Sequence, residues 1–286
     1  SQMYPSAKDC EKWLQENTDK PMMLCEYTHS MGNSNGAMHK YTDLTKKYER
    51  FQGGFIWDFA DQAIYTKDVD GTEHYNYGGD FLERPSDYDF CGDGIFFASR
   101  EWTPKLQEVR FNYQSIDTVI TPETIKITNR YLFTNTNEFN ATMTLLEDGI
   151  LVESFDLVVD CKPGQTVSID NPFEIEESEH EYALEISFTT HVATECIEAG
   201  YEIAYEQYIY PVNKVVTQVH APVEIIEDFV NVGIKGENFH VIFHKGKGLV
   251  AYEYLGKQML KEIPRPNFYR PSNQNDTGNG YGYRYG

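Results

Sequence analysis

The chain has 286 residues, of which 40% are hydrophobic and 14% are aromatic, and this composition excludes a largely disordered protein. Its 24 basic and 45 acidic residues give a formal net charge of -21. A surface of that sign repels nucleic-acid phosphates and anionic lipid, so we expect neither nucleic acid nor a membrane as a partner.

The cysteines and the hydropathy of the chain indicate its cellular setting. Five cysteines are spread widely and include no CxxC pair, which argues against a disulfide framework or a zinc site. No signal peptide opens the sequence, and no apolar run approaches the ~20 residues that cross a bilayer. The sequence therefore predicts a cytoplasmic protein.

The first elements are a short amphipathic helix and a buried strand. Ser6 and Asp9 have capping-box spacing ahead of helical periodicity that runs to Leu14. Residues 22–25 then form a continuous apolar run of the kind that a fully buried strand shows, and Glu26 follows directly. A carboxylate there is costly unless it is paired, hydrogen-bonded or useful. Glu26 is thus a candidate catalytic residue, and a structural Glu paired with Arg or capping a helix stays open.

A polar loop containing His29 follows this strand, and a second helix follows the loop. Apolar residues recur at helical spacing from Ala37 to Tyr48, and we expect a side-chain N-cap from residues 33–35. In an α/β barrel, such a loop lies on the face where active sites form. Residues 51–60 repeat the pattern of a glycine pair and an apolar run, so they predict another buried strand.

Residues 61–102 break this pattern and are expected to form a long loop, with a turn signal at Asp70-Gly71. A loop of this length is usually functional or disordered. Asp93 lies between two glycines that could hold its side chain outward as a ligand, although a plain turn aspartate is the commoner case.

From about residue 104 the pattern changes to alternating strands. A short helical stretch over residues 105–113 comes first, and Asp148-Gly149 is a hairpin signal between two later strands. Strands at this regular spacing predict an antiparallel sandwich, which we expect to close near Pro211. A third unit of alternating strands begins near Ala221.

These elements predict a mainly β protein with an α/β N-terminal part. Two buried strands and two helices cannot close an eight-stranded barrel, which takes about 250 residues. We therefore expect a fragment of a larger protein: the C-terminal portion of a (β/α)8 barrel over residues 1–103, an immunoglobulin-like β-sandwich over residues 104–220, and the incomplete start of another β domain over residues 221–286.

Four motifs carry a resemblance to a known family: LCEYTHSMGNSNG, QGGFIWDFADQAI, YGGDF and FCGDGIFF. In order and spacing they resemble the last two barrel strands of β-galactosidases of glycoside hydrolase family 2, the large bacterial lactase type. The resemblance continues through YLFTNTNEFNATMTLLEDG and reaches NFYRPSNQND in the C-terminal β-galactosidase domain, a β-supersandwich. It implies a retaining enzyme for terminal β-D-galactosides such as lactose, in a parent protein that is a homo-oligomer.

The resemblance also implies roles for four residues around the sugar. Glu26 matches the catalytic nucleophile, and Tyr4 matches a tyrosine that hydrogen-bonds this nucleophile. His29 matches a histidine that contacts the galactosyl group, and Trp57 matches an active-site tryptophan beside the sugar.

Phe90 and Asp93 match the family's sodium site, which uses a backbone carbonyl and a side-chain amide oxygen. This chain has Asp93 where Asn is usual. The resemblance further implies Mg²⁺ in the full-length parent, with most of its ligands absent here. The second carboxylate of the retaining pair also lies upstream in the family, so we expect the isolated chain to be inactive. Arg270, Asn275 and Asp276 match a loop that approaches the active site.

The competing hypothesis is a non-catalytic β-sandwich module for carbohydrate binding or for structural and interaction contacts. An exposed row of aromatic side chains would favour this module, whereas buried sandwich aromatics and an open Glu26 would favour the enzyme. Another family 2 activity, such as β-glucuronidase or β-mannosidase, is disfavoured because the downstream domains belong with the lactase type.

Overall fold

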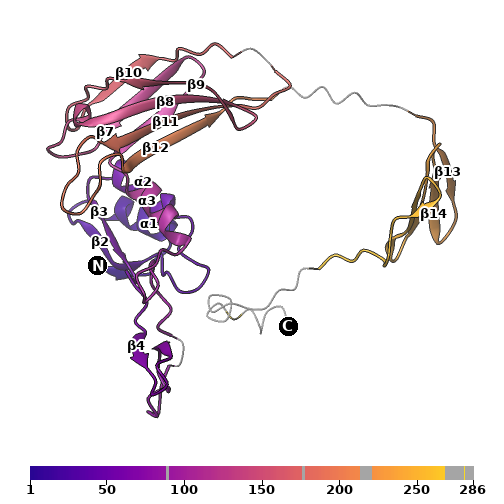
Figure 1. The fold of residues 1–286 in the computed structure, drawn as a ribbon, viewed down its shortest axis with the longest axis horizontal. Coiled ribbons are helices and arrows are strands. Elements are labelled where there is room, and N and C mark those ends of the chain that lie inside the picture. The colour runs from indigo at the N-terminus through magenta and orange to yellow at the C-terminus, as the bar shows by residue number, and fades with distance from the viewer. Residues whose placement is uncertain (88–89, 176–177, 213–220, 268–279, 281–286) are drawn as a thin grey trace. The chain divides into compact units, whose positions relative to one another are not determined.

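A computed structural model of the chain describes residues 1–87, 90–175, 178–212, 221–267 and 280 (Figure 1). They are mainly β, with three short α-helices. The chain divides into two compact units, one of residues 1–213 with 272–286 and one of residues 214–271. The domain boundaries expected at residues 103 and 220 stay predictions.

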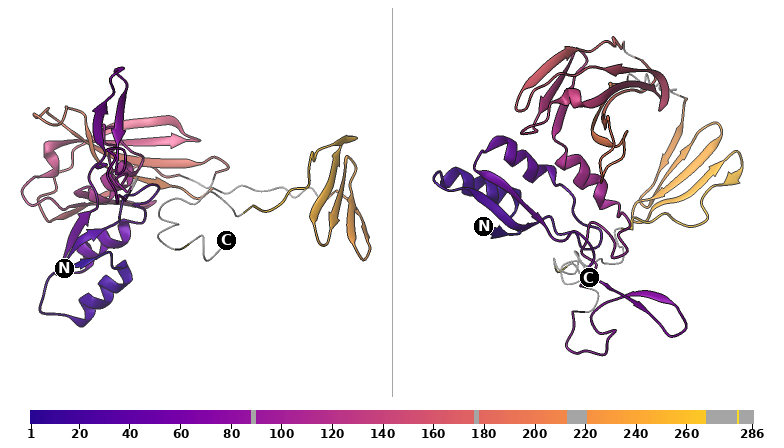
Figure 2. Two further views of the ribbon diagram at one scale, coloured as in Figure 1. Left: turned by 90° about the horizontal axis from the view of Figure 1, so that it is seen from below. Right: turned by 60° about the vertical axis from the view of Figure 1, so that its left-hand side comes forward.

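The N-terminal part is a parallel sheet of three strands in the order β1-β2-β3, with helices packed on one face (Figure 2). Leu14 and Leu24 are fully buried between this sheet and the helices, whereas Met23 and Phe55 on the opposite face are exposed. The elements are β1 (Gln2–Met3), α1 (Ala7–Glu16), β2 (Met22–Tyr27), α2 (His39–Lys47) and β3 (Phe51–Ile56).

The start of α1 was predictable, but the start of α2 was not. Ser6 caps α1 as predicted, because its Oγ accepts a hydrogen bond from the Asp9 amide at 3.1 Å. The predicted side-chain cap of α2 by residues 33–35 is wrong. Ser34 instead donates to the carbonyl of His29 within the loop, and α2 begins later, at His39, without a side-chain cap.

Two irregularities in the β2–β3 pairing change the direction of side chains. Between the pairs Met22–Phe51 and Leu24–Gly54, β3 contains one extra residue; between Leu24–Gly54 and Tyr27–Ile56, the extra residue lies in β2. Such bulges re-aim side chains. Leu24 and Tyr27 are therefore both buried, although they are three positions apart, and Glu26 between them is partly exposed.

Residues 61–87 and 90–102 contain more regular structure than the predicted long loop. An exposed hairpin of β4 (Ile64–Lys67) and β5 (Glu73–Asn76) turns at Asp70-Gly71. The turn signal was therefore a hairpin signal that the expectation of a long loop overlooked. After this hairpin, residues 91–96 form backbone hydrogen bonds with residues 58–62, which follow β3.

The next part is a β-sandwich that begins after α3 (Lys105–Tyr113), the helix predicted there. Two antiparallel sheets, ordered β10-β7-β6 and β12-β11-β8-β9, enclose a core that includes Ile127, Met143 and Phe188. The predicted Asp148-Gly149 turn joins β8 to β9. The elements are β6 (Ile116–Ile120), β7 (Thr124–Asn129), η1 (Thr136–Glu138), β8 (Phe139–Glu147), β9 (Ile150–Leu157), β10 (Thr166–Asp170), β11 (Tyr182–Thr190) and β12 (Glu202–Ile209).

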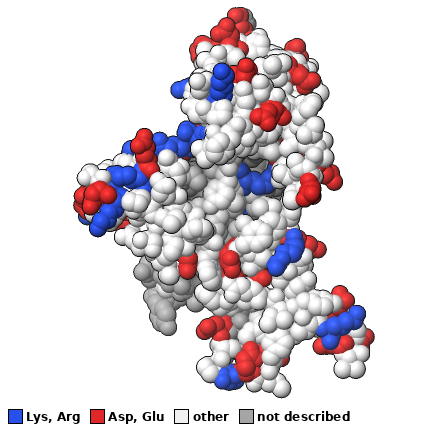
Figure 3. Space-filling model, turned by 90° about the vertical axis from the view of Figure 1, so that its left-hand side faces the viewer, with Lys and Arg blue, Asp and Glu red and all other residues white. Residues whose placement is uncertain are grey.

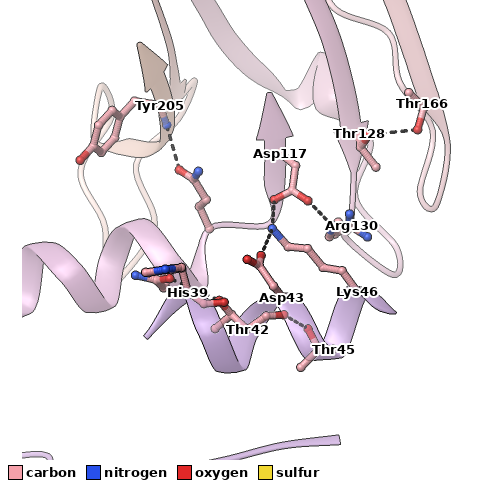
Figure 4. A network of polar contacts seen from close by, with 12 residues as sticks. His39, Thr42, Asp43, Thr45, Lys46, Asp117, Thr128, Arg130, Thr166 and Tyr205 are labelled. Atoms are coloured by element: carbon pink, nitrogen blue, oxygen red, sulfur yellow. Dashed lines mark hydrogen bonds and ion pairs between the residues drawn. The ribbon is translucent and has the colours of Figure 1, made fainter. Parts of the chain in front are cut away.

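An ion-pair cluster joins α2 to the sandwich (Figure 4). Asp117 on β6 pairs with Lys46 of α2, at 3.2 Å from Nζ to Oδ1, and with Arg130. Lys46 also lies 3.6 Å from Asp43. We call Lys46, Asp117 and Arg130 the joint cluster.

The second compact unit is a single antiparallel sheet in the order β13-β14-β15-β16-β17. None of its described side chains is buried within the unit. Its strands are β13 (Glu224–Glu227), β14 (Asn231–Lys235), β15 (Phe239–His244), β16 (Gly248–Tyr254) and β17 (Lys257–Gln258). The loop predicted to approach the active site, with Arg270, Asn275 and Asp276, lies outside the described residues.

The surface carries charges of both signs. On the face shown in Figure 3, acidic side chains are scattered and basic side chains lie between them.

Among the described helices, none has the length and apolar character to span a membrane.

Candidate active site

The predicted site residues meet at the carboxyl ends of the three parallel strands. Tyr4 follows β1, Glu26 lies near the end of β2, and Trp57 follows β3. Backbone hydrogen bonds fix this arrangement: the Tyr4 amide donates to the Glu26 carbonyl at 3.0 Å, and the Ser30 amide donates to the Trp57 carbonyl at 2.8 Å. Strand ends of this kind are where α/β folds place functional side chains.

Tyr4 and Glu26 form a short hydrogen bond. The phenol of Tyr4 donates to Oε2 of Glu26 at 2.6 Å, a length typical of a bond to a charged acceptor. Burial, together with the bond to Glu26 and the charge of Glu26, raises the pKa of the Tyr4 phenol well above its usual range. Glu26 is partly exposed, and it pairs with no Lys or Arg among the described residues. The alternative of a structural Glu paired with Arg is therefore disfavoured.

His29 lies between two other predicted site residues. Its ring centroid is 5.6 Å from that of Tyr4 and 6.0 Å from that of Phe90. The Met31 amide donates to Nδ1 of His29 at 3.2 Å. Because Nδ1 accepts this bond, Nε2 of the neutral ring carries the hydrogen and can donate to a ligand.

Trp57 is held by its side chain as well as by its backbone. Its indole Nε1 donates to Oδ2 of Asp93 at 2.9 Å, and the Gln62 amide group donates to the same oxygen at 3.3 Å. Asp93 is 1% exposed. Burial is the main cause that raises the pKa of its carboxyl, and the bond from Trp57 opposes this effect. Asp93 is thus not an ordinary exposed turn aspartate.

The predicted sodium residues fit a cation in one respect. Oδ1 of Asp93 is buried and has no hydrogen-bond partner in the described part of the chain, so it could serve as a cation ligand. Phe90 lies nearby, since its ring contacts His29. Within the described ranges, no group of three or more His, Cys, Asp or Glu is placed to hold a metal ion. The Mg²⁺ implied for the full-length parent stays a prediction.

Two polar residues of the site were not identified from the sequence. Gln62 contacts Asp93, and Lys105 at the start of α3 donates to the carbonyl of Ser30. Burial lowers the pKa of Lys105. The contact between Lys105 and Ser30 joins residues 75 positions apart, and no local pattern indicates such a pairing.

The sandwich shows no row of exposed aromatic side chains among its described residues. Most of its rings pack against the core, and Phe133 is 91% exposed. Tyr201 lies beneath the Arg110 guanidinium at 5.1 Å, and Tyr205 packs on Phe111 at 5.3 Å, so both contact α3. This arrangement does not favour the carbohydrate-binding module.

Comparisons with known proteins agree with the motifs. Residues 1–118 match the family model for glycosyl hydrolases family 2, TIM barrel domain, and residues 125–211 match that for beta-galactosidase, domain 4. The chain is 40% identical to a beta-galactosidase of Halalkalibacterium halodurans, over 97% of this chain and 28% of that protein. It is 39% identical to one of Streptococcus thermophilus (94% and 26%) and 38% identical to one of Clostridium acetobutylicum (99% and 32%). The chain thus spans less than a third of the length of these relatives.

Proposed function

Because the chain belongs to the family 2 glycosyl hydrolases, as its motifs predicted, we propose that it carries the nucleophile side of a retaining β-galactosidase active site. The observation that supports this most is the 2.6 Å bond from Tyr4 to Glu26 at the carboxyl ends of parallel strands, with His29 and Trp57 beside it. The substrates would be terminal β-D-galactosides such as lactose. The homo-oligomeric parent and the cytoplasmic location stay predictions.

Glu26 would act as the nucleophile. Its carboxylate attacks the anomeric carbon, a covalent galactosyl-enzyme forms, and the bond to the leaving oxygen breaks while a second carboxyl group protonates that oxygen. Water activated by this second group then releases the sugar. Tyr4 donates to Glu26 and stabilises its negative charge when the carboxylate is regenerated. Trp57 would offer a flat apolar face to the sugar, and Nε2 of His29 would offer a donor.

The second carboxyl group is the missing part of this reaction. Asp58 accepts from the Phe59 amide, Asp61 accepts from the Gly94 amide, and Asp93 is buried under Trp57. Each of these carboxylates is engaged in holding the loops, and none matches the family's acid. We therefore expect the 286-residue chain to show no turnover of a nitrophenyl β-galactoside above the buffer rate.

We also propose that Phe90 and Asp93 form a sodium site. The backbone carbonyl of Phe90 and the unpartnered Oδ1 of Asp93 would hold the sodium ion. When bound, its positive charge would offset the buried carboxylate.

Galactose titration of the chain, followed by calorimetry, tests the site against the competing module. We expect Trp57→Phe to weaken binding about tenfold, which corresponds to ~1.4 kcal/mol. The matched controls Tyr201→Phe and Tyr205→Phe on the sandwich should leave binding unchanged. Binding that is lost in the sandwich variants but unaffected by Trp57→Phe and Glu26→Gln would favour the module instead.

A further inference from the structure

Asp93 makes two separate contacts that both hold Trp57. Its side-chain Oδ2 accepts the indole hydrogen at 2.9 Å, and its backbone carbonyl accepts the amide of Asp58, the residue after Trp57, at 2.8 Å. One residue therefore fixes both the ring and the chain from which the ring projects. Only the first of these contacts depends on the identity of the side chain.

The surrounding segment makes Asp93 a rigid support. Residues 91–96 and 57–62 are joined by several backbone hydrogen bonds, including Ile95 amide to Asp58 carbonyl at 3.0 Å and Gln62 amide to Cys91 carbonyl at 2.8 Å. The Gln62 side chain adds a bridge, since its Nε2 donates to Asp58 at 3.0 Å and to Asp93 at 3.3 Å. Asp93 thus belongs to a segment whose position is set by many contacts.

The burial of Asp93 needs an explanation. A carboxylate that is 1% exposed is costly unless donors satisfy it, and a plain turn aspartate would point to solvent. Here Trp57 and Gln62 both donate to Oδ2. A buried acceptor aimed at an indole hydrogen leaves the ring little freedom to rotate, because rotation would leave both groups unpaired.

We propose that Asp93 is a positioning residue that fixes the indole plane of Trp57 at the end of β3, the strand next to that of Glu26, through the hydrogen bond from Nε1 to Oδ2. The significance of the ring orientation for sugar binding rests on the proposed function; the positioning itself does not. The positioning also requires no metal ion, because Oδ2 is occupied by protein donors while Oδ1 stays without a partner.

The indole N–H of Trp57 gives a direct test in the 286-residue chain. The chain has three tryptophans, Trp13, Trp57 and Trp102, so selective nitrogen labelling gives three indole signals, and Trp57→Phe identifies the one of interest. We expect its hydrogen to exchange slowly with solvent. Asp93→Leu should raise the exchange rate at least about tenfold and move the signal, with the Trp13 signal unchanged as the control for folding. Asp93→Asn retains an oxygen acceptor, so it should preserve both the slow exchange and the position of the Trp57 signal.

An unchanged Trp57 signal and exchange rate in folded Asp93→Leu would overturn the proposal. So would an Asp93→Asn variant that behaves like Asp93→Leu, because the charge and not the acceptor would then matter. If Asp93→Leu does not fold, the test uses the unsubstituted chain in a buffer in which choline replaces sodium. The indole hydrogen of Trp57 should still exchange slowly. Fast exchange in choline would contradict the proposal. None of these measurements uses a sugar, so their failure is distinct from failure of the proposed function.

Discussion

At the scale of single residues, the central feature is the position of Glu26. The extra residue in β2 lets Leu24 and Tyr27 remain buried against the helices while Glu26 stays partly exposed at the strand end. Tyr4 reaches Glu26 from the neighbouring strand, and its backbone φ of 50° is a conformation that non-glycine residues rarely adopt. Such a conformation persists only where surrounding contacts enforce it.

The first prediction concerns the pKa of Tyr4. Two of the causes that raise it are the hydrogen bond to Glu26 and the negative charge of Glu26. Glu26→Gln removes the charge, so the tyrosinate becomes easier to form and the pKa should fall. It should remain above the usual value of about 10, because burial is the larger cause and persists. Titration of carbon-labelled tyrosine by NMR measures the shift.

A matched control for this titration is Glu73→Gln on the exposed hairpin. Glu73 raises the pKa of Tyr65, not that of Tyr4. The Tyr65 signal should therefore respond to this control and the Tyr4 signal should not. If Glu26→Gln leaves the Tyr4 titration where it was, the hydrogen bond between the two residues does not persist in solution.

At the scale of elements, the sequence predicts what depends on local pattern and misses what depends on distant partners. The strand over residues 22–25, the cap at Ser6 and the turn at Asp148-Gly149 were all predicted, because each is a short-range signal. The strand was expected to be buried on both faces, but Met23 and Cys25 are exposed, so only one face is buried. The predicted cap at the start of α2 was wrong, because the Ser34 hydroxyl donates its hydrogen bond to the His29 carbonyl within the loop. Tyr4 and Trp57 became candidates only through the family resemblance, whereas the loops that carry His29 and Asp93 were singled out from the residues themselves. No periodicity indicates that these side chains meet.

The second prediction tests the contact between residues 57–62 and 91–96. A methyl group at Gly94 would overlap the backbone of Ala60, Asp61 and Phe96. Backbone cannot move aside cheaply, so Gly94→Ala should lower the free energy of unfolding by about 1–3 kcal/mol. Urea denaturation measures the loss.

Gly36→Ala is the matched control, because its added carbon meets nothing within 4 Å and its φ is not in the left-handed region. Its stability should lie within about 0.5 kcal/mol of the parent chain. Equal stabilities for the Gly94 and Gly36 variants would mean that residues 91–96 are not packed as described.

The third prediction concerns Asn129, a fully buried residue of the sandwich that sequence reasoning did not single out. Its Nδ2 donates to the carbonyls of Thr134 and Cys161, and its Oδ1 accepts from the Tyr131 amide. Asn129→Ala removes these three hydrogen bonds from the core, and among the described residues only the Cys161 carbonyl keeps another donor, the Thr136 amide, so the substitution should cost about 3 kcal/mol or more. Thermal unfolding of this variant and of the exposed control Asn137→Ala measures the difference; comparable losses in the two would refute the role of Asn129.

At the scale of the whole molecule, the joint cluster links the element that follows the site to the sandwich. Asp117 is the shared acceptor, with a side chain that is 18% exposed, whereas Asp43 is 63% exposed. The fourth prediction is that Asp117→Asn lowers stability by about 1–2 kcal/mol, since Lys46 and Arg130 both lose their shared negative charge and Lys46 keeps only the exposed Asp43. The loss should shrink at high salt.

Asp43→Asn is the corresponding control, with an expected loss below about 0.5 kcal/mol. Urea denaturation of both variants at low and high salt measures these effects. An Asp117 variant as stable as the Asp43 variant at low salt would show that the joint cluster does not hold α2 to the sandwich.

The central claim for the chain as a whole is that Glu26 is the nucleophile. The chain spans less than a third of the length of its relatives. A fluorosugar galactoside with a dinitrophenyl leaving group tests this claim directly, because so good a leaving group needs no proton donor. After incubation with the 286-residue chain, peptide mass mapping should find one galactosyl adduct, on Glu26. The adduct should be absent from Glu26→Gln and undiminished in Glu73→Gln. An adduct on another carboxylate, or no adduct at all, would contradict the assignment.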